Sequence, residues 1–226
     1  MKLMLIDTSG PVCSAALVED THILAEFSLN NGLHHSMNLM PMVDALLTIA
    51  DTPIESMDVF AAVTGPGSFT GVRMGVTTIK AFSEALEKPC FGIDALEALA
   101  FGAKSVPGVI CPILDARARQ VYAAMFQGGE RICEDEALPL TEFLEKVRAT
   151  GESPYFLGDG VLTLRPMIEE VMPARFAQPA NLHLRAGCAA LLAVEKIRAG
   201  AKLETHLSLE PLYLRKPQAE RERENA

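Results

Sequence analysis

The sequence predicts an α/β protein with two similar lobes, and two observations carry this prediction. Short apolar segments of strand length alternate with longer segments of helical periodicity through most of the chain. Two stretches also have the pattern of three-stranded meanders, each headed by an apolar strand that ends in aspartate, Asp7 in the first and Asp115 in the second. In both, an Ala-Ala-Leu or Ala-Ala-Met triplet begins eight residues after that aspartate. This repetition indicates an internal duplication of one α/β unit.

The first predicted lobe, residues 1–104, opens with three apolar segments separated by turns. The pattern then changes to that of a helix, and a Thr-Pro-Ile-Glu sequence at residues 52–55 has the cap-like features of a further helical turn. A buried strand runs into a glycine-rich loop, and an amphipathic helix follows the loop. The predicted strands span residues 3–6, 13–18, 23–27 and 59–63, and the predicted helices span residues 36–50 and 72–86.

The second predicted lobe, residues 105–215, begins after a break near residues 102–108, where the strand pattern starts again. Gly128-Gly129 predicts a hairpin turn, and strands then alternate with helices. The tail, residues 216–226, alternates charges and lacks apolar anchors, so we expect it to be disordered. The predicted strands span residues 109–114, 121–126 and 155–157 with a third meander strand starting at 131–133, the helices span 140–148, 161–171 and 182–198, and a last apolar segment spans 212–214.

The composition is that of a soluble globular protein, with 49% hydrophobic and 22% charged residues among 226. A formal net charge of -9 repels phosphate backbones and argues against autonomous nucleic-acid binding. The five cysteines include no C-x-x-C pair, so neither a disulfide framework nor a zinc knuckle is indicated. The longest uncharged apolar stretch, residues 186–194, is about half of a membrane span. We therefore expect a cytoplasmic chain that makes no membrane contact.

The most informative motif is the loop Gly65-Pro66-Gly67-Ser68-Phe69-Thr70-Gly71 between a predicted strand and a predicted helix. Backbone amides and a helix N-terminus at this place can cradle an anion. A tight turn that needs glycine for positive φ explains the same residues equally well. The loop is not a P-loop, because no Gly-Lys-Ser/Thr follows, and it departs from the dinucleotide-binding fingerprint, because the last glycine arrives one residue late.

Two aspartate-containing turns are candidates for the opposite walls of a cleft. Asp7-Thr8-Ser9 and Gly158-Asp159-Gly160 offer a carboxylate at a strand end, which suits contact with a phosphate or a metal-bound water. Ordinary turn chemistry, in which Asp and Ser bond their own backbone, is the simpler explanation for each turn taken singly. Together with the glycine loop, the candidate cleft residues are Asp7, Thr8, Gly65, Gly67, Ser68, Gly71 and Asp159.

The predicted helix 36–50 has an unusually broad apolar circumference. Asp44, Thr48 and Asp51 form a narrow polar stripe, and leucine, methionine, valine and isoleucine occupy the rest. One core does not require so much of a helix surface to be apolar. Either this helix is sandwiched inside the domain, or it presents an apolar face to a partner, for which adaptable methionines are suited.

Four segments together resemble the bacterial TsaB family, also called YeaZ. They are residues 5–9, the helix beginning at His35-Ser36, the glycine loop with its trailing Val72-Arg73, and Asp115-Ala116-Arg117 leading to Val121-Tyr122. The resemblance extends from residue 1 to the segment 211–215. It implies the two-lobed actin-like ATPase fold with duplicated mixed sheets, and it implies a role in threonylcarbamoyladenosine (t6A) formation in tRNA.

The same resemblance implies that this chain is not the catalyst. TsaB resembles a degenerate paralogue of TsaD, the transferase that modifies adenosine 37 in tRNAs that read codons beginning with A. The His-x-x-x-His metal motif of TsaD falls within residues 93–99 of this chain, where the ligand positions hold Ala95 and Leu99. Neither side chain has a metal-ligating atom, so the catalytic metal site is missing and a peptidase activity is unsupported.

The resemblance therefore implies a non-catalytic subunit that binds a TsaD-like partner through the helices 36–50 and 72–86. We expect a TsaE-like ATPase in the assembly, homodimers when the chain is alone, contact with tRNA only through the partner, and no tightly bound cofactor, with ATP and a metal held by the partner subunits. The expected interface residues are Met37, Met40, Val43, Leu47, Arg73, Val76 and Lys80.

The alternative is a free-standing ATP-dependent phosphotransferase or ATPase of the actin-like superfamily. Its nucleotide cleft would be lined by Asp7, Thr8, Gly67, Ser68 and Asp159. A zinc peptidase is a third possibility, but the five histidines include no pair spaced i, i+4 with a nearby carboxylate to complete a helix-borne site.

Overall fold

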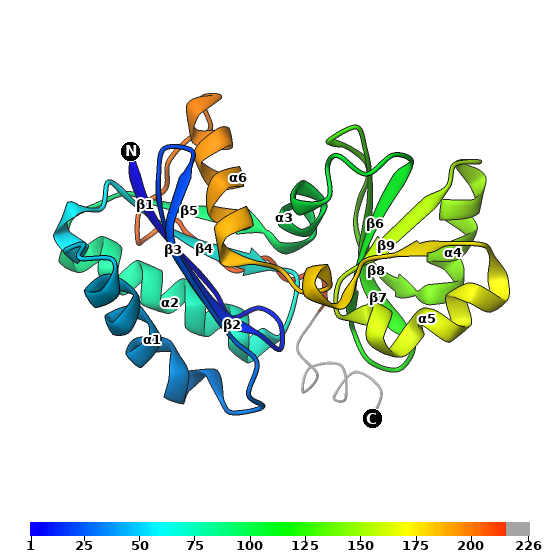
Figure 1. Ribbon diagram of the computed structural model, residues 1–226, viewed down its shortest axis with the longest axis horizontal. Helices are drawn as coiled ribbons and strands as arrows, with labels where there is room; N and C mark the ends of the chain where they lie inside the picture. Colours follow the sequence, from blue (N-terminus) through cyan, green and yellow to red (C-terminus); the bar gives the residue numbers. More distant parts are fainter. Residues whose placement is uncertain (216–226) are drawn as a thin grey trace.

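The computed structural model describes residues 1–215 and has two lobes, each built on a five-stranded mixed sheet (Figure 1). The strand orders are β3-β2-β1-β4-β5 and β10-β9-β6-β7-β8. In each sheet the first strand pairs antiparallel with the second and parallel with the fourth, which confirms the duplicated α/β architecture. The strands are β1 (Lys2–Asp7), β2 (Cys13–Glu19), β3 (His22–Leu29), β4 (Val59–Gly65), β5 (Cys90–Asp94), β6 (Val109–Asp115), β7 (Gln120–Gln127), β8 (Glu130–Pro139), β9 (Pro154–Leu157) and β10 (Arg175–Phe176).

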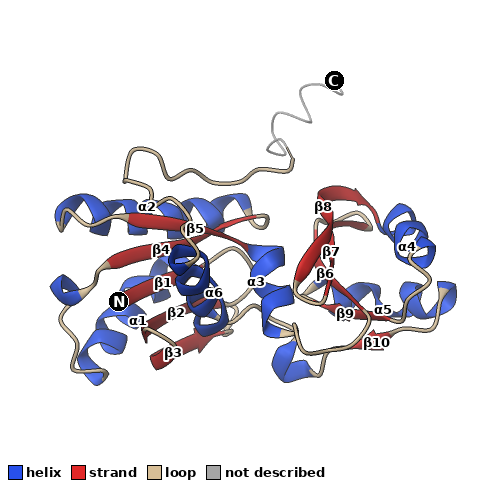
Figure 2. Ribbon diagram, turned by 90° about the horizontal axis from the view of Figure 1, so that it is seen from above, coloured by secondary structure: helices blue, strands red, loops and turns tan. Residues whose placement is uncertain are grey.

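Helices cover both faces of the first sheet because its strands are apolar on both sides. In β1, Leu3 and Leu5 enter one core cluster while Met4 and Ile6 enter the other, as the two-residue period of a strand requires. α1 and α2 cover the Met4 side, whereas α4 and α5 flank the second sheet (Figures 1 and 2). The helices are α1 (His35–Ile49), α2 (Phe69–Ala85), α3 (Ala95–Gly102), α4 (Leu140–Ala149), α5 (Gly160–Val171) and α6 (Ala186–Arg198), with short 3-10 turns at Ile54–Ser56 and Pro179–Asn181.

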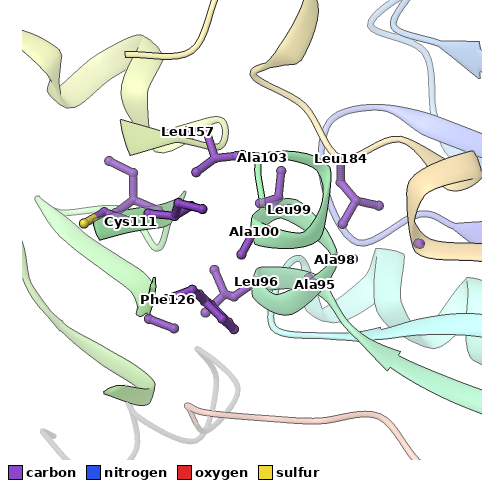
Figure 3. Close-up of a cluster of buried hydrophobic side chains, with 14 of the residues drawn as sticks. Ala95, Leu96, Ala98, Leu99, Ala100, Ala103, Cys111, Phe126, Leu157 and Leu184 are labelled. Carbon is purple, nitrogen blue, oxygen red and sulfur yellow. The ribbon is translucent and has the colours of Figure 1, made fainter. Parts of the chain in front are cut away.

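The third helix of each repeat packs on the sheet of the other repeat. α3 follows β5 in the chain but packs on β6 and β7, and α6 follows β10 but packs on β1, β2 and β3. Figure 3 shows Leu96 and Ala100 on the side of α3 that faces Cys111 and Phe126 of the second lobe. The two helices also contact each other, so one continuous apolar core runs through both lobes.

The boundaries differ from the sequence-based prediction in three places. β5, α3 and the two-residue strand β10 were not predicted as separate elements. The predicted helix 182–198 begins only at Ala186. Although residues 105–215 were assigned to the second lobe, α6 packs on the first sheet and Glu204 forms an antiparallel bridge with Cys90 of β5. The predicted tail, residues 216–226, lies outside the described residues.

No helix within residues 1–215 combines the length and the apolarity that crossing a membrane requires.

The shared core predicts that the two lobes unfold together. Leu96→Ala in α3 removes a fully buried side chain and should lower the free energy of unfolding by about 2–5 kcal/mol. Leu162→Ala on α5, where the side chain is 60% exposed, is the matched control and should change it by less than about 0.5 kcal/mol. Urea unfolding followed by circular dichroism should give one transition in both variants; two separated transitions in Leu96→Ala would contradict a common core.

Candidate functional site

A cavity of about 520 Å³ lies between the lobes, at the carboxyl ends of β1 and β6. The loops after β4 and β9 and the turn after β6 contribute its walls, and residues 212–215 complete them. The hydroxyl and charged groups that line it are Ser9, Ser68, Thr70, Asp115, Arg117, Tyr122, Asp159, Tyr213 and Arg215. This arrangement places polar groups of both lobes at the position where parallel strands of α/β proteins present their ligand sites.

The glycine loop packs tightly against the end of β1. A Cβ atom on Gly71 would lie 2.1 Å from the carbonyl oxygen of Thr8, and one on Gly67 would lie 2.4 Å from that of Ser9. The Ser68 N–H donates to the Ser9 carbonyl at 2.7 Å, and the Thr8 hydroxyl donates to the Gly71 carbonyl at 2.7 Å. The glycines are therefore required by close contacts within the chain, which supports the structural interpretation of this loop.

Ser68 then starts α2 as its N-cap residue. Its hydroxyl oxygen accepts a hydrogen bond from the Gly71 N–H at 3.3 Å. Val72, Val76 and Ile79 follow at helical spacing and are buried against the first sheet. The cap at Ser68 and the buried face of α2 therefore place the N-terminus of this helix at the mouth of the cavity.

The second lobe repeats this contact with different residues. A Cβ atom on Gly158 would lie 2.1 Å from the carbonyl oxygen of Ile113 in β6, and Gly158 has a φ of 101°. Between the two glycines, the Asp159 carboxylate accepts from the Asp115 N–H at 3.0 Å. Burial raises the pKa of Asp159 above its ordinary value. Both lobes thus hold the loop after the fourth strand of the repeat against the end of its first strand.

Asp7 is a buried carboxylate behind the cavity wall. Its Oδ1 accepts from the Ser9 N–H at 2.8 Å, so the side chain organises the turn that follows β1. Burial is the main cause that raises its pKa to about 6; the hydrogen bonds from Ser9 and the nearby His35 act in the opposite direction. His35 places Nε2 at 2.9 Å from the Gly10 carbonyl oxygen, which ties the start of α1 to the same turn.

The structure separates the seven predicted cleft residues into two groups. Gly67, Ser68 and Asp159 line the cavity, whereas Asp7, Thr8, Gly65 and Gly71 lie behind its surface. The sequence analysis did not assign the aromatic and basic side chains of the walls to the cleft, although the glycine loop and the segments with the family resemblance contain them. The missed lining residues include Phe69, Arg117, Tyr122, Tyr213 and Arg215.

The predicted partner interface divides in a similar way. Met37 and Met40 are exposed on α1, and Leu47 is half-buried. Val43 and Val76 are buried against the first sheet, so their side chains do not lie on the exposed surface of their helices. The two cationic residues of α2, Arg73 and Lys80, bond to the C-terminal segment of the same chain.

The positions that correspond to the metal ligands of TsaD lie on the α3 face between the lobes. Ala95 and Leu99 border a second, small cavity together with Asp7, Asp159 and His183. Within residues 1–215, no three His, Cys, Asp or Glu side chains are grouped so as to hold a metal ion. The residues present therefore do not fit a TsaD-type metal.

Comparison with known proteins shows which family this chain resembles. The family model for TsaD, tRNA N6-adenosine threonylcarbamoyltransferase, matches residues 22–223. The Bacillus subtilis tRNA threonylcarbamoyladenosine biosynthesis protein TsaB is 33% identical over 226 residues, which cover 97% of this chain and 96% of that protein. The Escherichia coli protein of the same name is 35% identical over 132 residues, 58% of this chain and 57% of that protein.

Solved structures show the same fold. YeaZ from Pseudomonas aeruginosa is 25% identical with a TM-score of 0.76, over 94% of this chain and 99% of that one. Another Pseudomonas aeruginosa structure, of an uncharacterized protein similar to the peptidase YeaZ, is 26% identical with a TM-score of 0.75, over 95% of this chain and 99% of that one. The ROK hexokinase of Thermus thermophilus, 14% identical with a TM-score of 0.50 over 88% of this chain and 100% of that one, shares the fold alone.

Two sheets of one topology around an interlobe cleft define a protein of the actin-like ATPase fold class. Within that class, the full-length match to the Bacillus subtilis protein and the match to the TsaD family model decide the family. The chain belongs to the TsaB family, also called YeaZ.

The close contact at Gly71 predicts that a single methyl group disturbs the site. Gly71→Ala forces the Thr8 backbone away and should cost about 1–3 kcal/mol of stability. Gly10→Ala, in the same cleft, is the matched control because a Cβ atom there has nothing within 4 Å. Thermal unfolding should show a lower midpoint for Gly71→Ala alone; equal midpoints would mean that the loop does not pack on β1 as described.

The raised pKa of Asp7 predicts a pH-dependent cost. The folded state, with a pKa of about 6, binds more protons than the unfolded chain, in which the carboxyl titrates near 3.8. This group therefore lowers the free energy of unfolding as the pH rises from about 4 to about 6, by an amount that reaches about 3 kcal/mol. Asp7→Asn keeps the acceptor for the Ser9 N–H and removes this cost.

The measurement is the free energy of unfolding of wild type and Asp7→Asn between pH 4 and pH 8. The variant should gain stability relative to wild type as the pH rises through 6 and hold that gain above it. Asp44→Asn, at an exposed position of α1, is the control and should follow wild type. A difference between Asp7→Asn and wild type that does not change with pH would show that the carboxyl titrates normally.

Proposed function

We propose that this chain is a non-catalytic accessory subunit of t6A formation in tRNA and that it binds a TsaD-like transferase. The names of the Bacillus subtilis and Escherichia coli relatives support the pathway. The exposed apolar surface of α1 is the observation that supports a partner-binding role. The transferase, in this proposal, modifies adenosine 37 of tRNAs that read codons beginning with A.

α1 exposes two methionine side chains near its N-terminus. Met37 is 63% exposed and Met40 is 50% exposed, and the two lie on the same side of the helix. Beside them, a groove of about 490 Å³ runs between α1 and β3, with Phe27 and Pro41 among its lining residues. β3 is the edge strand of its sheet. Exposed methionines beside an apolar groove suit contact with a partner, because methionine side chains adapt to different surfaces.

The loss of ligating atoms at Ala95 and Leu99 supports the non-catalytic part of the proposal. In this proposal the TsaD-like subunit holds the metal and ATP, a TsaE-like ATPase joins the assembly, and this chain binds no cofactor tightly. The net charge of -9 suits a subunit that meets tRNA only through its partner. When the partner is absent, the same apolar face of α1 is available to pair two copies of this chain in the cytoplasm.

The alternative, a free-standing ATPase or phosphotransferase, has weaker support. Asp7 and Thr8 are buried and hydrogen-bonded within the chain. The glycine loop packs directly on the backbone that follows β1, which leaves no space for a ligand between the two. Calorimetry with ATP and magnesium on the isolated chain separates the two functions, because tight binding with turnover would favour the alternative.

The proposed interface predicts that one charge on α1 weakens partner binding. Met40→Asp places a carboxylate in the apolar surface, where binding would desolvate it, and should weaken binding of a TsaD-like subunit at least tenfold. Leu162→Asp, at a side chain on α5 that is 60% exposed, is the control and should bind like wild type. Co-expression followed by size-exclusion chromatography at micromolar concentration measures this; wild type that elutes alone would overturn the proposed function.

A further inference from the structure

The C-terminal segment, residues 202–215, returns from α6 along the first lobe to the mouth of the cavity. Figure 2 shows it as a long loop that passes over β5 and α2 toward the space between the lobes. Near its start, Glu204 forms an antiparallel bridge with Cys90, and its carboxylate accepts from the Gly92 N–H at 2.9 Å. We call this segment the strap.

The strap is anchored along α2. Leu209 is fully buried in the core beneath α2, and its carbonyl oxygen accepts from the Lys80 ammonium at 3.1 Å. Further along, the hydroxyl oxygen of Tyr213 accepts from the Arg73 Nε–H at 2.7 Å. The Tyr213 ring lies 4.9 Å from that of Phe69, and the Arg73 guanidinium lies 3.9 Å above the latter. A buried side chain, an aromatic pair and two cationic donors thus hold the strap in one position.

The end of the strap forms part of the cavity wall on the first lobe. The Leu212 N–H donates to the Thr64 carbonyl at 2.7 Å, next to the glycine loop. A Cβ atom on Gly65, which has a φ of 119°, would lie 2.7 Å from the Leu212 carbonyl oxygen. The close approach of the strap therefore requires a glycine at position 65. The anion-binding hypothesis had instead explained this glycine by contact with a ligand.

The strap then crosses to the second lobe. The Arg215 guanidinium donates to the Ala116 carbonyl at 3.1 Å. Ala116 precedes the turn between β6 and β7, in which Arg117, Ala118 and Arg119 all have positive φ, 64°, 51° and 59°. Three successive left-handed residues other than glycine are unfavourable without external support. Within the second lobe, the Asp115 carboxylate accepts from the Arg117 N–H at 2.7 Å, and the Leu140 N–H donates to the Arg119 carbonyl at 3.0 Å. The bond from Arg215 adds a contact to the start of this turn from the opposite side of the cavity.

We propose that the strap is an intramolecular latch that closes the interlobe cleft. In the docked state, α2 fixes residues 209–213, and Arg215 ties the β6–β7 turn across the mouth. Release of the strap opens the cleft and frees Arg73 and Lys80 on the outer side of α2. This inference concerns the isolated chain and does not depend on the proposed function.

Hydrogen–deuterium exchange of the full-length protein, read by mass spectrometry, tests the latch. The release variant combines Tyr213→Ala and Arg215→Gln. Exchange at Leu212 and in the cleft segments 64–70 and 115–120 should become at least tenfold faster, while β2 and α5 stay unchanged. Arg165→Gln, which removes an arginine paired with Glu169 on α5, is the matched control and should leave the cleft segments as in wild type.

A second variant separates latching from folding. Arg215→Gln alone removes the bond across the cleft and keeps the anchors at Leu209 and Tyr213. It should speed exchange in segment 115–120 and leave Leu212 protected. Two results would overturn the proposal: a Leu212 amide that exchanges in wild type as fast as in an unstructured peptide, or a cleft whose exchange is unchanged once the strap is released. Faster exchange in β2 of the release variant would indicate unfolding, and the single variant then decides.

Discussion

The reciprocal exchange of α3 and α6 between the two repeats is the constraint on which the rest of the structure depends. α6 covers β1, β2 and β3 of the first sheet, and α3 covers β6 and β7 of the second, so each lobe completes its core with a helix from the other repeat. Small residues allow the two helices to approach each other closely. Alanines dominate the buried faces of both helices, and Gly102 of α3 lies close to Cys188 of α6. The cleft is therefore not a gap between independent domains, because its floor is set by core packing.

The sequence predicted most of this architecture because its strongest signals are local. Repeated apolar strands ending in Asp7 and Asp115 indicated the duplication, and hydrophobic periodicity located α1, α2, α4 and α5. β5 and α3 were not predicted because no turn residues separate them. Asp94 is both the last residue of β5 and the N-cap residue of α3. Periodicity also does not say which apolar stripe faces the core, which is why Val43 and Val76 were assigned to a partner.

The candidate site was less predictable because long-range contacts decide it. The residues of the glycine loop were identified, but their role depends on Thr8 and Ser9 at the end of a different strand. The strap depends on pairs separated by more than a hundred residues, such as Arg73 with Tyr213 and Lys80 with Leu209. A short apolar segment such as 212–214 has no periodicity that would indicate such partners. Only the assembled fold shows that these residues meet at one cleft.

The chain itself makes the close contacts at the end of β1. There the glycine loop packs on the backbone that follows β1, and the N-terminus of α2 lies beside the cavity. The backbone after β1 packs closely against Gly67 and Gly71, and the backbone of the strap packs closely against Gly65. α2 begins at the glycine loop, and its Arg73 and Lys80 bond to the strap. A structural change on the outer side of α2 therefore affects the mouth of the cavity through the strap. The C-terminal segment thus connects the outer side of α2, the glycine loop and the β6–β7 turn in one set of contacts.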